Sequence, residues 1–214
     1  MEVKEGVLYV ATGGASESYV YQSNRDGFYT FDRVRWTTYN QFNTPEIEAS
    51  GLLNFFRILP HPVEDIIYVG SYWGGLLKYD GETYTVFDTS NSSLQGAVGD
   101  AQRVRIAGLA FDEDNNLWVT NYLAGEPLSV LKADGTWKSF PLPCSNITNT
   151  AQLVVDRRGY KWIMLYSKAA SLIVFDDGGT IDDESDDRCV QLSASNTAIP
   201  SNSVNCLAVD VEGD

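Results

Sequence analysis

The sequence predicts an all-β fold, a β-propeller fragment of about four four-stranded antiparallel blades, with the fourth blade split between the two termini. The first observation is a repeated hairpin frame, which occurs at 108–122, at 152–166 and in shorter form at 206–214. The second is that the stretches between these copies divide into short apolar runs separated by turn residues. Composition agrees, because 18 Gly, 12 Tyr, 9 Phe and 5 Trp favour strands and tight turns over helices. A β-sandwich is the alternative, but it does not predict four-strand units that carry the same hairpin.

The repeated frame is a hairpin built around an aspartate. Its copies read "GLAFDEDNNLWVTNY", "QLVVDRRGYKWIMLY" and "CLAVDVEGD". Alternating apolar residues before the Asp indicate a half-buried strand. The Asp accepts turn amides, and a Gly or Asn three positions later supplies positive φ. In the two complete copies a Trp lies six positions after the Asp, in the returning strand "LWVTNY" or "KWIMLY". Two irregular second strands, "GVLYVATGG" (6–14) and "DIIYVGSYW" (65–73), carry Tyr9 and Tyr68 in place of that Trp.

A third and a fourth apolar run follow each second strand and complete a blade. The third strands are predicted in "GFYTFD", "GLLKYDG", "LSVLKADG" and "SLIVFDD", and the fourth in "RWTTYN", "TYTVFDT", "TWKSFPLP" and "CVQLSA". No helix is needed. The predicted units are 1–48, a blade lacking its first strand; 49–103 and 104–148, two blades; 149–198, a blade with an acidic insertion; and 199–214, the first strand of a truncated blade.

The two ends of the chain are predicted to hold complementary parts of one blade. Val204, Leu207 and Val209 would each lose about 1.5–3 kcal/mol if they were exposed, and the edge of their strand would invite pairing. The last strand is therefore expected to close onto the first unit within one chain, or to be exchanged between two chains of a homodimer. An open arc of blades is the alternative.

These repeats resemble a known family. The pattern of two-component-regulator propeller repeats, "LPSNxVxxLAxDxxGxxWVGT", is similar to "IPSNSVNCLAVDVEGD" at 199–214, and "GLAFDEDNNLWVTNY" matches its core. Such repeats build the extracytoplasmic sensors of hybrid histidine kinases in Bacteroidetes and the PorZ-type proteins of the type IX secretion system. The strings "LSVLKADGTWKSF", "VVDRRGYKW" and "FDDGGTIDDESDDR" look more like the PorZ type. The first two units are irregular, and "ILPHPVEDIIYVGSY" lacks the Asp–x–x–Gly turn.

The resemblance implies a non-enzymatic interaction module in the periplasm or at the outer-membrane-associated cell surface. For the PorZ type it implies help in processing and attaching secreted cargo, with contacts to the sortase machinery and to lipopolysaccharide. One alternative is the glycan-sensing domain of a hybrid two-component system. The second alternative is a carbohydrate-binding or lyase propeller.

Charge and composition argue against several function classes. The net charge of −14 repels nucleic acid and anionic lipid, so neither is expected as a partner. The one histidine, His61, lies between prolines where a surface turn is expected, so no His-based triad or zinc site is predicted. Cys144, Cys189 and Cys206 can form at most one intrachain disulfide, and they are interpreted as small buried apolar residues. We predict no catalytic residue and no membrane span, and recognise no signal peptide after Met1.

A set of aromatic residues forms the first candidate site. Tyr72, Tyr122 and Tyr166 each lie four residues beyond the aromatic anchor of their blade, and Trp73 follows the first of them. Equal offsets place them at one end of the blades, where exposed rings can stack on sugars. The alternative is that they cap the core.

The acidic insertion at 176–188, "DDGGTIDDESDDR", forms the second candidate site. Many carboxylates on a flexible loop suit calcium, and the sequence suggests no other cofactor, although the spacing differs from that of an EF-hand. A solvated loop is the alternative interpretation. The candidate calcium ligands are Asp176, Asp177, Asp182, Asp183 and Asp186.

Overall fold

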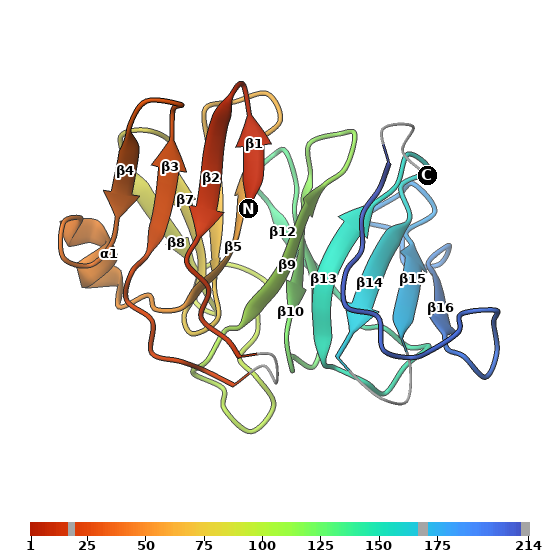
Figure 1. Ribbon diagram of the computed structural model, residues 1–214. Coiled ribbons are helices and arrows are strands. Elements are labelled where there is room, and N and C mark those ends of the chain that lie inside the picture. Colours follow the sequence, from red (N-terminus) through yellow and green to blue (C-terminus); the bar gives the residue numbers. More distant parts are fainter. Residues whose placement is uncertain (17–19, 167–170, 211–214) are drawn as a thin grey trace. The chain divides into compact units, whose positions relative to one another are not determined.

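A computed structural model of the chain describes residues 1–16, 20–166 and 171–210. In this part of the chain, 16 β-strands form four four-stranded antiparallel sheets, each with its strands in sequential order (Figure 1). The all-β fold, a β-propeller fragment of four blades, is therefore confirmed. The chain divides into two compact units, residues 1–107 and 108–214.

The first unit contains two blades and a short helix. The strands of the first blade are β1 (Glu2–Lys4), β2 (Val7–Ala11), β3 (Phe28–Phe31) and β4 (Trp36–Tyr39). The strands of the second are β5 (Phe55–Pro60), β6 (Ile67–Ser71), β7 (Gly75–Tyr79) and β8 (Tyr84–Phe87). Phe28, Phe55 and Val69 contribute to one buried core made by both sheets.

The helix α1 (Pro45–Ser50) connects the two blades of the first unit, where the sequence predicted no helix. Pro45 stands at its start, where the missing amide hydrogen costs nothing. Gly51 ends it with a left-handed φ of 67°. Ile47 is buried and joins the core, so the helix closes one side of it.

The first blade has a first strand of its own, which differs from the prediction that unit 1–48 lacks one. Strand β1 pairs with β2 through Glu2↔Tyr9, Val3↔Leu8 and Lys4↔Val7. The turn between them holds Glu5 and Gly6, both at positive φ (51° and 81°), as a two-residue hairpin loop requires. A strand of three residues, two of them charged, has no alternation long enough to be recognised in the sequence.

The second unit contains the other two blades, apart from the first two residues of β9. The strands of the third blade are β9 (Ile106–Phe111), β10 (Leu117–Asn121), β11 (Leu128–Leu131) and β12 (Trp137–Phe140). The strands of the fourth are β13 (Thr150–Val155), β14 (Lys161–Leu165), β15 (Leu172–Asp176) and β16 (Arg188–Leu192). The two sheets share a core in which the rings of Trp118, Phe140 and Phe175 stack or tilt against one another.

The segment after β16 runs beside β13 without forming a strand in its described part, which differs from the first strand predicted at 199–214 (Figure 1). Its link to β13 is a side chain: Gln152 Nε2 donates to the carbonyl oxygen of Leu207 at 2.7 Å, and Gln152 Oε1 accepts from the amide of Leu207 at 2.9 Å. The Gln152 side-chain amide thus makes the two hydrogen bonds to Leu207 that the backbone of a paired strand would otherwise make. Val204, Leu207 and Val209 are half-buried, and residues 211–214 of the predicted strand lie outside the described residues.

Candidate functional site

The two complete copies of the repeated frame form the predicted turns at one end of the second unit. Asp112 Oδ1 accepts from the amides of Asp114 and Asn116, and Asp156 Oδ1 accepts from those of Arg158 and Tyr160. The predicted positive φ occurs in both turns, at 62° for the Asn of the first and 82° for the Gly of the second. The aspartates therefore hold rigid turns that line a recess.

The recess has a volume of about 530 Å³ and lies among four connections of the second unit. These are the turns β9–β10, β11–β12 and β13–β14 and the acidic insertion between β15 and β16. Its charged lining residues are Asp112, Glu113, Asp114, Lys132, Asp134, Asp156, Arg157, Arg158, Lys161, Asp177 and Asp182. A volume of this size fits a small molecule.

A buried ion pair borders the recess. Lys161 Nζ lies 2.7 Å from Asp177 Oδ1, and their side chains are only 2% and 8% exposed. The same Nζ lies 4.0 Å from the ring centroid of Trp118, a cation–π contact. The strand register explains the pair, because Lys161 faces Phe175, two residues before Asp177. Sequence reasoning missed Lys161, although a lysine directly before the Trp in "YKWIM" was a usable signal.

The acidic insertion is held against the third blade by two lysines. Lys132 Nζ lies 3.1 Å from Asp182 Oδ2, and Lys138 Nζ lies 3.2 Å from Glu184 Oε1. Lys138 also donates to the carbonyl oxygen of Ile181 at 2.7 Å. These pairs are partly exposed, so each contributes little stability by itself, but together they set the position of the loop.

The five candidate calcium ligands have separate protein partners. Asp177 pairs with Lys161 and Asp182 with Lys132. The remaining three make local bonds: Asp176 accepts from the amide of Gly178, Asp183 from that of Ser185, and Asp186 from the hydroxyl of Thr180. Within residues 1–16, 20–166 and 171–210, no three His, Cys, Asp or Glu residues are grouped so as to hold a metal ion. Calcium binding remains a prediction, and measuring the melting temperature as calcium is added would test it.

A further carboxyl of the insertion, that of Asp187, has a raised pKa. Burial raises the pKa of Asp187, while Lys138 acts in the opposite direction and Glu184 adds to the rise. Asp187 Oδ1 is buried without a hydrogen-bond partner in the described part of the chain. The surroundings of the Asp187 carboxyl therefore disfavour its ionised form.

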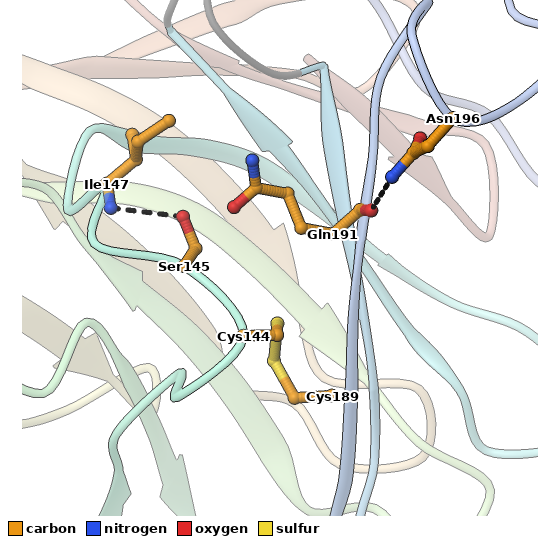
Figure 2. The surroundings of a disulfide bond; sticks show 6 residues. All are labelled: Cys144, Ser145, Ile147, Cys189, Gln191 and Asn196. Carbon is orange, nitrogen blue, oxygen red and sulfur yellow. Dashed lines mark hydrogen bonds between the residues drawn. A yellow bond between two sulfur atoms is a disulfide. The ribbon is translucent and has the colours of Figure 1, made fainter.

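A disulfide joins the outer parts of the third and fourth blades (Figure 2). Cys144, just after β12, is bonded to Cys189 on β16, with their Cα atoms 5.4 Å apart. Both cysteines pack against the shared core of the second unit, and Cys206 is free and exposed. The interpretation of all three cysteines as buried apolar residues is thus wrong for Cys206 and incomplete for the other two. The sequence allows one intrachain disulfide among the three cysteines but does not show which two of them form it.

The four candidate aromatic ligands lie in both units and differ in exposure. In the first unit Tyr72 is 1% exposed, and Trp73 is stacked on Tyr21 with a centroid distance of 3.8 Å. The guanidinium of Arg103 lies 3.4 Å from the Trp73 ring centroid. Two groups this near to one ring must occupy opposite faces, so neither indole face is open to a sugar.

In the second unit the aromatic candidates are Tyr122 and Tyr166. Tyr122 is buried at 6% exposure, as expected of a core cap, whereas Tyr166 is 40% exposed. Of the four aromatic candidates, Tyr166 alone has the exposure that stacking on a glycan would need. Glycan binding at this end of the blades remains a prediction.

The single histidine has a local structural role. His61 is buried, and its Nδ1 accepts from the amides of Val63 and Glu64 at 3.2 and 2.9 Å. Burial is the main cause that lowers the pKa of His61. The ring therefore fastens the β5–β6 turn.

Comparisons with known proteins place the fold. No protein-family model matches the chain, and a search of curated proteins found no match. Among solved structures, the chain is similar to PorZ, an essential bacterial surface component of the type-IX secretion system of Porphyromonas gingivalis. That match has a TM-score of 0.80 at 23% identity and covers 99% of this chain. The chain spans about 30% of the length of PorZ.

Two further solved structures share the fold. The extracellular domain of a proposed one-component system from B. thetaiotaomicron matches with a TM-score of 0.61 at 17% identity, over 99% of this chain and 24% of that one. A streptogramin B lyase matches with a TM-score of 0.52 at 14% identity, over 81% of this chain and 57% of that one. At these identities the likeness concerns the fold, which serves several functions.

Among the described residues, no helix is long and apolar enough to cross a membrane.

Proposed function

We propose that the chain is part of a non-catalytic extracytoplasmic β-propeller that acts as an interaction module of type IX secretion. The observation that carries the proposal is the similarity to PorZ over 99% of this chain. The Cys144–Cys189 disulfide supports an extracytoplasmic location, because such bonds persist in oxidising compartments. The local role of His61 favours a non-catalytic module over a histidine-dependent lyase.

Removal of the gene that encodes the chain from its own organism tests the secretion role. Loss of cargo processing and attachment at the cell surface is the expected result, and re-expression should restore both. Surface labelling and thiol titration of the native protein should find it outside the cytoplasm with Cys144 and Cys189 oxidised. Unchanged cargo attachment in the deletion strain would contradict the role.

The second candidate function is the sensing domain of a signalling system. The extracellular domain from B. thetaiotaomicron supports it, again over 99% of this chain. In that case the deletion strain should keep cargo attachment and lose a transcriptional response to an extracellular ligand. One deletion strain, analysed for cargo and for transcripts, thus separates the two functions.

A further inference from the structure

We propose that the recess of the second unit binds an uncharged polyhydroxyl ligand, the chemistry of a sugar, through the buried ammonium group of Lys161 and the carboxylates around it. Neither candidate function assigns a ligand to this recess, so the inference goes beyond both. It rests on the hydrogen-bonding capacity that these side chains leave unused and on the balance of charge among the lining residues.

Lys161 is buried with part of its donor capacity unused. An ammonium group has three N–H donors. Within the described residues, the one oxygen that Lys161 Nζ contacts is Oδ1 of Asp177 at 2.7 Å. The Trp118 ring, with its centroid 4.0 Å from Nζ, attracts the charge but supplies no oxygen acceptor. A buried donor without an acceptor costs free energy. Because Lys161 is 2% exposed and lines the recess, a ligand oxygen in the recess would supply the missing acceptor.

Carboxylates of the third blade supply acceptors at the same recess. Glu113 and Asp114 on the β9–β10 turn and Asp134 on the β11–β12 turn are exposed and line it. None of the three has an ion-pair partner in the described part of the chain. The amide and the hydroxyl of Thr136 donate to Asp134 Oδ1 at 2.8 and 2.6 Å and fix its position. Its Oδ2 has no hydrogen-bond partner among the described residues and can accept from a ligand hydroxyl.

The balance of charge in the recess favours a ligand without net charge. Acidic side chains outnumber basic ones among the residues that line it, so an anion would be repelled. A cation that reached Lys161 would be repelled by its ammonium group. A hydroxyl group both donates and accepts hydrogen bonds, so a polyol can complement Lys161 and the Asp134 carboxylate together.

The recess is distinct from the site expected at the aromatic candidates. Lys161 is the first residue of β14 and Tyr166 follows the last, so the two residues lie at opposite ends of that strand. Among the described residues, no aromatic ring lines the recess. Recognition therefore depends on hydrogen bonds without the stacking that aromatic rings provide, and we expect a dissociation constant of about 1 mM.

Titration by NMR tests the proposal on the whole chain. The probes are glucose, galactose, mannose and the uronate of each hexose, which carries a carboxylate on the same ring. At least one hexose should shift the amides of the β9–β10, β11–β12 and β13–β14 turns. Its uronate should bind at least about tenfold more weakly, about 1.4 kcal/mol. Absence of shifts with all three hexoses, or equal binding of a hexose and its uronate, would overturn the proposal.

A double variant assigns the binding to Lys161. Lys161→Met alone leaves the Asp177 carboxylate buried without its partner, so it is combined with Asp177→Asn, and urea unfolding checks that the double variant is folded. Hexose binding should be at least about tenfold weaker in this variant. Glu82→Gln, an exposed change in the first unit, is the control and should leave the affinity unchanged. An unchanged affinity in the folded double variant would show that Lys161 is not a ligand-binding residue.

Asp134→Asn tests the acidic side of the recess. The substitution keeps one oxygen for the Thr136 bonds but replaces the free oxygen with an amide group that cannot accept, so hexose binding should weaken. Tyr166→Ala separates the recess from the aromatic candidate and should leave the hexose shifts at the three turns in place. Loss of those shifts in Tyr166→Ala, or their persistence at full affinity in Asp134→Asn, would overturn the assignment.

Discussion

The indole Nε1 of Trp118 donates a 2.8 Å hydrogen bond to Oδ2 of Asp112, and Trp162 makes the same bond to Asp156 at 2.9 Å. Each carboxylate thus uses one oxygen for the amides of its turn and the other for the indole. Because the Trp six positions later lies on the returning strand, one Asp joins the turn to that strand. This bond gives the repeated frame a physical reason for its spacing.

Replacement of Asp112 by Asn should destabilise the protein by about 1–3 kcal/mol. The Asn side chain has one acceptor oxygen, so it cannot replace both the oxygen that accepts from the turn amides and the oxygen that accepts from the fully buried indole. Urea unfolding measures the loss. Asp114→Asn in the same turn is the control and should change stability by no more than about 0.5 kcal/mol, since its carboxylate is exposed. Equal effects of the two substitutions would contradict this role of Asp112.

Replacement of Lys161 by Met should destabilise the protein by about 3–5 kcal/mol, because it leaves the Asp177 carboxylate buried without its partner. Adding Asp177→Asn to Lys161→Met should recover much of the loss, since the buried charge is then removed. Urea unfolding of the single and double variants gives the coupling energy. A double variant no more stable than Lys161→Met would show that the loss comes from packing against Trp118 instead.

The repeated frame predicts the inner hairpins of the third and fourth blades because its signals are local. The Asp, the Gly or Asn at positive φ and the Trp all act within one hairpin, and the structure confirms the turns at Asp112 and Asp156. Four-strand units follow from the same local alternation. The sheets of the second, third and fourth blades could therefore be read from the sequence, whereas the short strand β1 of the first blade could not.

The features that sequence reasoning missed depend on partners far along the chain. The Lys161–Asp177 pair requires the register of β14 with β15, and the Cys144–Cys189 bond requires two blades to pack together. Burial of Tyr72 depends on the residues packed around it. A spacing rule placed Tyr72 at the end of a strand but could not distinguish a core cap from an exposed platform.

Reduction of the Cys144–Cys189 disulfide should lower the stability of the protein by about 2–4 kcal/mol, because the bond closes a loop with a sequence separation of 45. The double Ser variant at both positions should show the same loss without reductant. Thermal unfolding with and without reductant measures it, and Cys206→Ser is the control that should leave the melting temperature unchanged. Insensitivity of the parent protein to reductant would count against the bond.

Asp187 should make stability depend on pH in a direction opposite to that of an ordinary surface carboxylate. Because burial raises its folded pKa, the folded state binds more protons than the unfolded state between the two pKa values. Its contribution is present below the unfolded pKa and is lost as pH rises through the folded pKa. Asp187→Asn should therefore stabilise the protein near neutral pH and remove this slope.

Asp183, in the same insertion, is the matched control for Asp187. Hydrogen bonds from Ser185 lower the pKa of Asp183, so its contribution is present above the unfolded pKa and is lost as pH falls through the folded pKa. Melting curves between acid and neutral pH should show Asp183→Asn as destabilising and Asp187→Asn as stabilising. The same sign for both variants would contradict the assignment.

Gln152 should control the order of the segment that follows β16. Its side-chain amide both donates to and accepts from the backbone of Leu207, so Gln152→Ala removes both bonds. Gln152→Glu keeps an acceptor for the Leu207 amide but places a second oxygen against the Leu207 carbonyl. Hydrogen exchange at Leu207 should therefore accelerate in both variants, while amides of β14 keep their protection.

Gln102→Ala, at an exposed position of the first unit, is the control. Unchanged exchange at Leu207 in Gln152→Ala would mean that packing of the half-buried Val204, Leu207 and Val209 holds the segment on its own.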